Sequence, residues 1–196
     1  SGGTVYGEGP IPLQENTPCN PICSYGIVKH AIEQYLELFR SQHGLEYVVL
    51  RIGNPYGPAQ TGGNGQGVLG AFIQKIRRNE SLEVWGDGSV VRDFIHVDDV
   101  ARAFAHALSY DGAFRVFNVG TGVGTSVKQI IEILGRVTGR DIPCEYLPKR
   151  GCDLPANVLA VDRMKQEMNW APQIDMQAGV AAMFDAAVAN GQEAGQ

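Results

Sequence analysis

Residues 24–53 read "SYGIVKHAIEQYLELFRSQHGLEYVVLRIG", a helical pattern followed directly by a strand-like one. Apolar side chains recur at helical spacing over residues 25–43, which predicts a long helix. Ser24 is the candidate N-cap of this helix, and Gly44 is the candidate C-cap. Residues 45–53 then form a β-branched run bounded by turn residues, which predicts a buried strand. A helix that leads into a buried strand is the alternation of an α/β sheet.

Tyr25 and Lys29 stand four residues apart in this predicted helix, so both lie on one face and their polar ends can meet. An exposed tyrosine beside an exposed lysine is the ordinary interpretation of such a pair. The functional interpretation is a tyrosine acid/base whose pKa is lowered by the neighbouring cation. The pair by itself does not decide between the two.

Composition and charge narrow the class of protein. The 196 residues carry a net charge of -5 at pH 7, which argues against a nucleic-acid binder. No apolar run reaches membrane-spanning length, and the N-terminus does not resemble a signal peptide, so no membrane partner is expected. The 4 cysteines are irregularly spaced and the 4 histidines do not cluster near them. This favours free thiols in a reducing cytoplasm over a zinc site.

The rest of the chain continues the alternation of helices and strands. The expected elements are a glycine-rich loop over 54–67, a helix over 68–78, a strand over 82–86, a strand end at 94–96, a helix capped by Asp98 or Asp99, a strand over 114–122, a helix beginning at Ser126, and a short helix within 165–170. At the N-terminus, "TVYG" at residues 4–7 indicates the end of a strand. Because the rest of that strand would be missing from its sheet, a fragment or a processed product is expected.

Six motifs follow one another in a characteristic order: SGGTVYG (1–7), SYGIVK (24–29), LRIGNPYGP (50–58), WGDG with VRDFIHVDDVA (85–101), FNVGTG with TSV (117–127), and RGCDLP (150–155). The series resembles the later half of extended short-chain dehydrogenase/reductases that act on nucleotide sugars, and it is most similar to UDP-hexose 4-epimerases. The resemblance implies NAD as cofactor and a UDP-sugar as substrate. It also implies the C-terminal portion of a Rossmann-type doubly wound parallel sheet with a small α/β substrate-binding lobe.

For the chemistry, the resemblance implies that Tyr25 exchanges a proton with a sugar hydroxyl while the nicotinamide takes or returns hydride. Lys29 would lower the pKa of Tyr25 and hold the nicotinamide ribose. The family's catalytic serine aligns with Gly2, which is a departure, so Thr4 becomes the candidate for the missing hydroxyl. If residues 2–4 are extended, Thr4 and Gly2 face the same way. Filling a strand with a β-branched residue explains Thr4 equally well.

For the sugar nucleotide, the resemblance assigns Asn54 and Arg92 to the diphosphate, Arg150 to a phosphate and Asp153 to the nucleoside ribose. Asn157 or Val158 falls where several epimerases place a larger aromatic residue. A smaller residue there predicts that a 2-N-acetyl group is tolerated, as in UDP-GlcNAc and UDP-GalNAc. Asp93, Asp98 and Asp99 are interpreted as structural, through helix capping and an arginine partner.

The function expected from the resemblance is NAD-dependent 4-epimerisation of a UDP-hexose through a transient 4-keto sugar. Dehydratases of this family carry an acid before Val-Tyr-Gly, and residues 2–4 carry none, so dehydration is disfavoured. Another epimerase or reductase of the family, or a non-catalytic binding module, remains an alternative. The helix after Ser24 is apolar on more than one face, and the resemblance implies that this helix joins its mate in a dimer, so a homodimer is expected. The free thiols favour the cytoplasm as its location.

The resemblance also sets expected domain limits. Residues 1–54 would end the NAD-binding domain, and residues 55–196 would mainly bind the sugar nucleotide, with about 93–120 returning to the Rossmann part. The glycine-rich turn that binds the cofactor's phosphates is not in this sequence, so the 196 residues alone are expected to be inactive.

Overall fold

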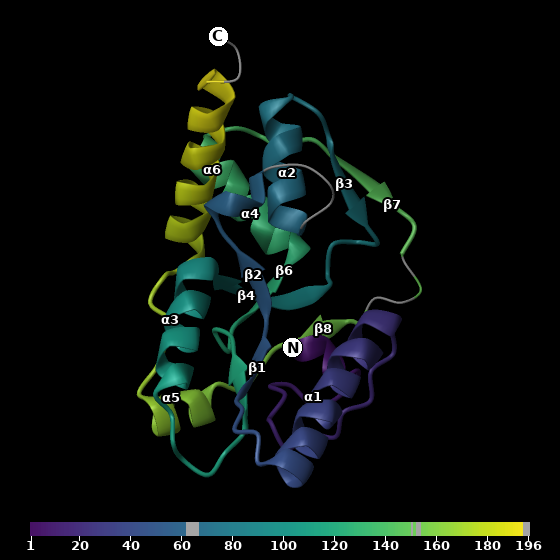
Figure 1. The fold of residues 1–196 in the computed structure, drawn as a ribbon. Helices are drawn as coiled ribbons and strands as arrows, with labels where there is room; N and C mark the ends of the chain where they lie inside the picture. Colours follow the sequence, from purple (N-terminus) through teal and green to yellow (C-terminus); the bar gives the residue numbers. More distant parts are fainter. Residues whose placement is uncertain (62–66, 150, 152–153, 194–196) are drawn as a thin grey trace.

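The computed structural model describes residues 1–61, 67–149, 151 and 154–193. Its helices are α1 (Ser24–His43), α2 (Val68–Arg77), α3 (Val97–Leu108), α4 (Val127–Thr138), α5 (Asp162–Met168) and α6 (Met176–Glu193), with 3-10 turns η1 (Gly3–Val5) and η2 (Pro58–Thr61). Its strands are β1 (Val49–Ile52), β2 (Asn54–Tyr56), β3 (Leu82–Trp85), β4 (Val91–His96), β5 (Val116–Val119), β6 (Gly124–Ser126), β7 (Cys144–Leu147) and β8 (Ala156–Asn157). Helices and strands alternate through most of the chain (Figure 1).

Parallel pairing dominates the sheets. Strand β1 pairs with β5 in parallel, and Gly2 bridges in parallel to Ile52 at the end of β1. Strand β4 pairs in parallel with both β2 and β8 and antiparallel with β6, while β3 pairs in parallel with β7. Parallel neighbours need crossover connections, which the helices supply. The expected α/β class with parallel sheets is therefore confirmed.

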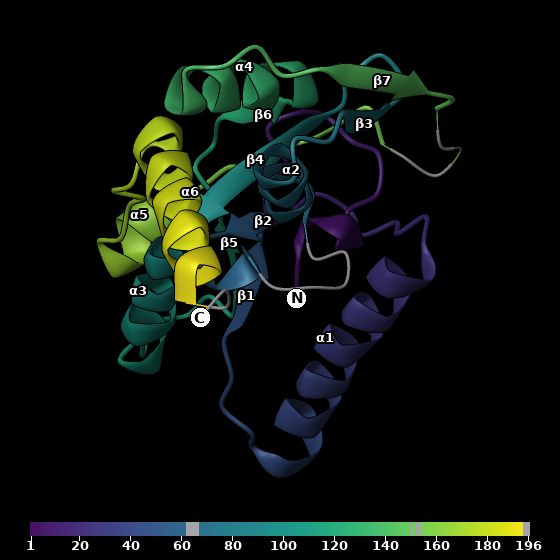
Figure 2. The ribbon, with the colours of Figure 1, turned by 90° about the horizontal axis from the view of Figure 1, so that it is seen from above.

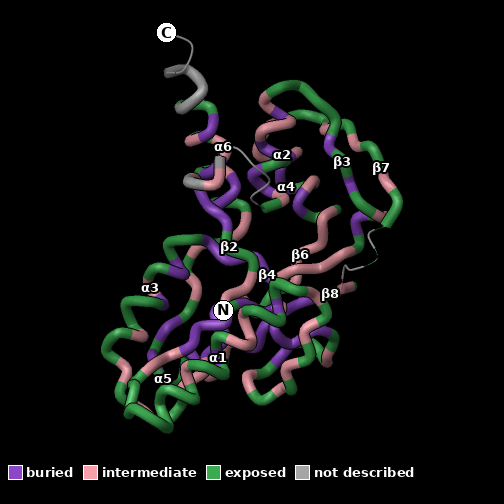
Figure 3. Tube along the Cα trace, turned by 45° about the vertical axis from the view of Figure 1, so that its right-hand side comes forward, coloured by how far each residue is buried: buried purple, intermediate pink, exposed green. Residues whose placement is uncertain are grey.

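Two groups of buried apolar side chains hold the elements together. One lies between β1, β5, α3 and α5 and includes Leu50, Phe117 and Trp170. The other joins α2, α4 and α6 to β3 and includes Leu82 and Leu134. Helices α1 and α3 lie on opposite sides of β1 (Figures 1 and 2). Helix α1 contributes to neither group, and most of its residues are not buried (Figure 3).

Several expected boundaries need correction. The segment "TVYG" is not the end of a strand, because Gly3–Val5 forms the turn η1. The expected strand over 45–53 is confined to β1, and the expected loop over 54–67 begins with β2. The short helix within 165–170 is α5, which begins and ends earlier. Strands β6, β7 and β8 and helix α6 were not expected from the sequence pattern.

The helix caps divide into confirmed and corrected predictions. Ser126 caps α4 through a capping box with Gln129, as expected, and Gly44 ends α1 in the left-handed conformation. Ser24 is wrong as an N-cap, because the cap position of α1 is Cys23, which makes no side-chain capping bond. His96 replaces the two aspartates as the cap of α3 by accepting a hydrogen bond from the Asp98 amide.

No helix in the described ranges is long and apolar enough to cross a membrane. The expected domain limits stay a prediction.

Candidate active site

A pocket of about 380 Å³ lies where the N-terminal segment, the start of α1 and the β1–β2 connection meet. Thr4, Tyr25 and Asn54 all line it, together with Gln60 and Gly67. The segments that bring them there are far apart in sequence. The Gly2–Ile52 bridge places η1 beside the end of β1, and α1 begins against η1. Three residues predicted to belong to the site therefore share one cavity.

Tyr25 and Lys29 occupy successive turns at the start of α1. The Lys29 Nζ lies 5.3 Å from the centroid of the Tyr25 ring, close enough for a cation–π contact. The Tyr25 side chain is exposed and borders the pocket, so its phenol is accessible to a ligand. The convergence expected from the four-residue spacing is present in the structure.

Thr4 lies in the middle of η1, and its Oγ1 is buried without a hydrogen-bond partner among the described residues. A buried hydroxyl normally has a partner, so an unpaired one beside a cavity fits a ligand contact. The extended backbone on which the same-face argument for Thr4 and Gly2 rested is wrong, because Thr4 belongs to a 3-10 turn. Thr4 still reaches the pocket, by a different backbone path.

Gln60 was not singled out from the sequence. Its Nε2 donates to the Pro55 carbonyl at 2.9 Å, and its Oε1 is buried without a partner among the described residues. Two residues that line the pocket, Thr4 and Gln60, therefore each carry a buried polar atom that is unpaired within the described ranges. The one sequence signal for Gln60 was its place a few residues after Asn54, a predicted site residue. Nothing in the turn residues around Gln60 distinguishes its side-chain amide from an ordinary turn residue.

Arg92 and Asn157 face each other across the β4–β8 pairing. The Arg92 Nη1 donates to the Leu154 carbonyl at 2.8 Å, which ties β4 to the segment before β8. The Asn157 side chain is buried, and its Nδ2 donates to the Gly3 carbonyl at 2.9 Å. Asn157 therefore holds the backbone of η1 in place through this hydrogen bond. Its predicted role at the sugar stays a prediction. Arg150 and Asp153, predicted for phosphate and ribose, lie outside the described residues.

Asp93 and Asp99 are structural, as predicted: Asp99 has the predicted arginine partner, whereas Asp93 accepts backbone hydrogen bonds instead of capping a helix. The Asp93 carboxylate is buried and accepts hydrogen bonds from the backbone amides of Thr121, Gly122 and Leu159. Burial raises the pKa of Asp93, and the hydrogen bonds counteract part of that rise. Asp99 pairs with Arg102 in the first turn of α3. Neither aspartate lines the pocket.

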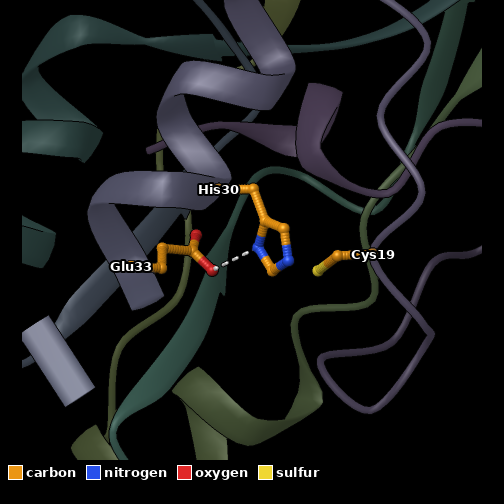
Figure 4. Close-up of side chains that lie close together, drawn as sticks. All are labelled: Cys19, His30 and Glu33. Atoms are coloured by element: carbon orange, nitrogen blue, oxygen red, sulfur yellow. Dashed lines mark ion pairs between the residues drawn. The ribbon is translucent and has the colours of Figure 1, made fainter. Parts of the chain in front are cut away.

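Cys19, His30 and Glu33 form a cluster with potential metal ligands (Figure 4). The Glu33 carboxylate, however, already receives Arg51 Nη2 at 2.6 Å and Nε at 3.1 Å. Burial raises the pKa of the Cys19 thiol, which opposes the thiolate that a metal requires. Because Arg51 already pairs with Glu33 and the Cys19 thiolate is disfavoured, this cluster does not fit a metal centre. The zinc alternative gains no support from it. Cys19, Cys23 and Cys144 are free thiols.

Comparisons with known proteins identify the family of the chain. The model of the NAD dependent epimerase/dehydratase family matches residues 1–120. A UDP-glucose 4-epimerase from Mycolicibacterium smegmatis is 37% identical over 92% of this chain and 58% of its own length. A dTDP-4-dehydro-6-deoxyglucose reductase from Escherichia coli is 30% identical over 92% of this chain and 57% of its own length. The chain thus spans less than two thirds of these relatives.

Two solved structures are similar to nearly the whole chain. A UDP-glucose 4-epimerase with UDP-glucose from Thermotoga maritima has a TM-score of 0.92 at 37% identity, covering 97% of this chain and 62% of that one. A UDP-N-acetylglucosamine 4-epimerase from Methanobrevibacter ruminantium, in complex with UDP-N-acetylmuramic acid, has a TM-score of 0.90 at 30% identity and the same coverage, 97% and 62%. The family match covers residues 1–120, which is more than half of the sequence. The chain belongs to the NAD dependent epimerase/dehydratase family.

Proposed function

We propose that this chain supplies the acid/base residues and the sugar-nucleotide side of an NAD-dependent UDP-hexose 4-epimerase. The observation that carries the proposal is the meeting of Tyr25 and the unpaired Thr4 hydroxyl at one pocket, with the Lys29 ammonium over the Tyr25 ring. A phenol, a hydroxyl and a cation together can move a proton to or from a sugar alcohol. The kinship to 4-epimerases supports the same reaction.

The residues divide the work in a simple way. Tyr25 takes the proton from the sugar C4 hydroxyl and later returns it, while the Lys29 ammonium lies over its ring. Thr4 Oγ1 holds the same hydroxyl in line with the phenol. Two unpaired polar atoms, Thr4 Oγ1 and Gln60 Oε1, fit a polar ligand in this pocket. Bound NAD would supply the reversible oxidation of the sugar alcohol to a ketone.

For the sugar nucleotide, we propose that Asn54 and Arg92 bind the diphosphate. Asn54 lines the pocket at the start of β2, and a guanidinium is well suited to phosphate oxygens. Arg150 and Asp153 would complete this side. A UDP-hexose with or without a 2-N-acetyl group is the proposed substrate, because similar structures include one with UDP-glucose and one named a UDP-N-acetylglucosamine 4-epimerase.

A reductase is the second candidate function, favoured by the 30% identity to the dTDP-4-dehydro-6-deoxyglucose reductase. A reductase would use the same tyrosine to protonate a 4-keto sugar, but it would consume one equivalent of reduced nicotinamide per turnover. An epimerase returns the electrons to the sugar and consumes none. Cofactor balance therefore separates the two.

We also propose a homodimer formed through α1, in the cytoplasm. Apolar side chains that are half exposed or nearly so occupy most turns of α1: Ile27, Val28, Ile32, Tyr35 and Phe39. An exposed apolar surface of this extent is typical of an interface. Sedimentation of the protein should give the mass of two copies, and a single-copy mass at micromolar concentration would refute the dimer.

The test of the reaction uses the full natural protein with UDP-glucose and UDP-GlcNAc, followed by product analysis without added reduced cofactor. We expect interconversion of each substrate with its C4 epimer. Tyr25→Phe should abolish it, and Thr4→Val should lower kcat by about a hundredfold, as misplacement of a reacting group does. Thr4→Ser, which keeps the hydroxyl, is the matched control.

Adding Gly2→Ser to Thr4→Val tests whether a hydroxyl at residue 2 can replace the Thr4 hydroxyl. A Cβ on Gly2 would lie 4.0 Å from Thr4 Oγ1 and 3.2 Å from the Ile52 carbonyl, so a serine needs only a small shift. Recovery of activity would show that either position can supply the hydroxyl. Full activity of Thr4→Val would contradict the role of Thr4, and absence of epimerised product from wild-type protein would contradict the reaction.

A further inference from the structure

Helix α1 contains the acid/base pair, yet it is attached to the rest of the chain by very little. Of its 20 residues, the buried ones are Gly26 and Glu33. Gly26 is a close backbone approach, since a Cβ there would lie 2.7 Å from the Thr4 carbonyl. Glu33 is therefore the one buried side chain of the helix. A carboxylate in that place needs an explanation, because buried charges are rare unless paired.

The partner of Glu33 is Arg51, in the middle of β1. Arg51 is 5% exposed and Glu33 8%, so the pair is shielded from water. Arg51 Nε donates to Glu33 Oε1 at 3.1 Å, and Nη2 donates to Oε2 at 2.6 Å. Two parallel hydrogen bonds of this kind fix both the distance and the orientation of the partners. Burial raises the pKa of Glu33, but the hydrogen bonds from Arg51 and Ser1 outweigh it and leave the pKa lowered.

Arg51 is held in place on its other side. Its guanidinium carbon lies 4.7 Å from the centroid of the Tyr6 ring, and Nη1 donates to the Glu15 carbonyl at 3.4 Å. The Tyr6 hydroxyl donates to Asn118 Oδ1 at 2.7 Å, which adds β5 to the network. Tyr6 directly follows η1, the turn that contains Thr4. The guanidinium thus touches both α1 and the segment that presents the Thr4 hydroxyl.

We propose that Glu33 and Arg51 are positioning residues that hold Tyr25 and Lys29 of α1 at a fixed distance from Thr4. Glu33 lies four residues after Lys29 and eight after Tyr25, so the pair acts on the face of α1 that carries both. Apolar packing would let the helix slide or rotate, whereas a buried bidentate pair has one geometry. The expected effect on kcat rests on the proposed function. The expected effect on the amide exchange of α1 does not.

The experiment compares Glu33→Gln, Arg51→Lys and the double variant Glu33→Leu with Arg51→Met in the full natural protein. Arg51→Lys keeps the charge but loses the planar fork. The apolar double variant removes both charges together, which commonly preserves stability. Glu37→Gln is the matched control, because Glu37 pairs with Arg40 on the exposed side of the same helix. The readouts are kcat and KM for UDP-glucose, and amide hydrogen exchange by mass spectrometry.

We expect both single variants to lower kcat by about tenfold to a hundredfold with KM unchanged, as misplacement of a reacting group does. Amide exchange should rise in peptides from 24–43 and stay unchanged in α4. The double variant should regain wild-type thermal stability but keep the low kcat. A merely structural role would instead return kcat with stability, and that result would overturn the proposal.

Two further outcomes are decisive. Unchanged exchange in α1 of Glu33→Gln would overturn the proposal whatever the activity. If wild-type protein epimerises no UDP-hexose, the proposed function fails, while the exchange comparison still decides whether the pair fixes α1. Faster α1 exchange with full kcat in Glu33→Gln would show that the helix tolerates the movement, and it would also overturn the positioning role.

Discussion

Helices α1 and α4 end alike and are held differently. Both end at a left-handed glycine, Gly44 with φ of 68° and Gly139 with φ of 66°. Helix α4 begins at the Ser126 capping box and buries three large aliphatic side chains, whereas α1 lacks a side-chain cap and buries Gly26 and Glu33. Helix α4 is held by apolar packing, whose stabilisation depends on the buried area and not on direction, so small displacements of the helix cost little. Helix α1 is held by the close approach of Gly26 to Thr4 and by the Glu33–Arg51 ion pair. These contacts define the position of the helix but add little to the free energy of unfolding.

The largest expected effect is on α4. Leu134 is fully buried, so Leu134→Ala should lower the free energy of unfolding by about 2–5 kcal/mol through lost burial and the cavity that remains. Ile32→Ala on α1 is the counterpart. Ile32 is 48% exposed within one copy, so in protein dilute enough to dissociate the proposed dimer the substitution should change the free energy by less than about 0.5 kcal/mol. Urea unfolding measures both. Equal losses in dilute protein would break the comparison, whereas a loss at Ile32 that grows with protein concentration would come from the second copy of the proposed dimer.

Glycine to alanine substitutions should act in opposite directions in the two helices. In α1, a Cβ on Gly26 would lie 2.7 Å from the Thr4 carbonyl, so Gly26→Ala should cost about 1–3 kcal/mol and displace Tyr25 from the pocket. In α4, a Cβ on Gly135 would meet the Arg140 carbonyl at an ordinary 3.4 Å, and Gly135→Ala should gain about 0.5–1 kcal/mol. Urea unfolding gives the sign of each. A tolerated Gly26→Ala would show that α1 is free to move outward.

Local sequence signals predicted the helices well. The end of α1 at Gly44 and the Ser126 cap of α4 depend on neighbours within one or two turns, and these predictions are confirmed, whereas the predicted Ser24 cap of α1 is wrong. The end of a strand was expected at "TVYG", but Gly3–Val5 is a turn. Its Gly3 carbonyl accepts a hydrogen bond from Asn157, a residue 154 positions later, and no local pattern reports such a contact.

The candidate site shows the same division. The Tyr25 and Lys29 contact follows from helical spacing and is present. The environment of Thr4 Oγ1 and the unpaired Gln60 amide depend on how η1 and η2 fold against β1, which the sequence alone does not reveal. Glu33 was part of a predicted helix, but its pairing with Arg51 joins α1 to a strand and required the tertiary structure.

Acid should loosen the attachment of α1 before the rest. The lowered pKa of Glu33 means that its stabilising contribution is present above its ordinary value of 4.5 and is lost as pH falls through the folded pKa. The raised pKa of Asp93 acts with the opposite sign, because protonation at low pH relieves a buried charge. In urea unfolding, the stability gap between wild type and Glu33→Gln should therefore shrink below about pH 4.5, by at most about 1.4 kcal/mol per pH unit. A constant gap down to about pH 3 would contradict this linkage.

The smallest expected effect is at the helix starts. Ser126→Ala removes the hydroxyl that accepts from the Gln129 amide and should cost about 1 kcal/mol. Cys23 has the extended backbone of an N-cap, with φ of -136° and ψ of 155°, but makes no side-chain capping bond. Cys23→Ser replaces the sulfur by a slightly smaller oxygen that can accept a capping hydrogen bond, so it should stabilise α1 by up to about 1 kcal/mol. Hydrogen exchange in the first turn of each helix resolves changes this small. If Cys23→Ser slows exchange at the start of α1 without changing activity, the missing cap was a loss of stability only. If it lowers kcat, the uncapped start of α1 is itself part of how Tyr25 reaches the pocket.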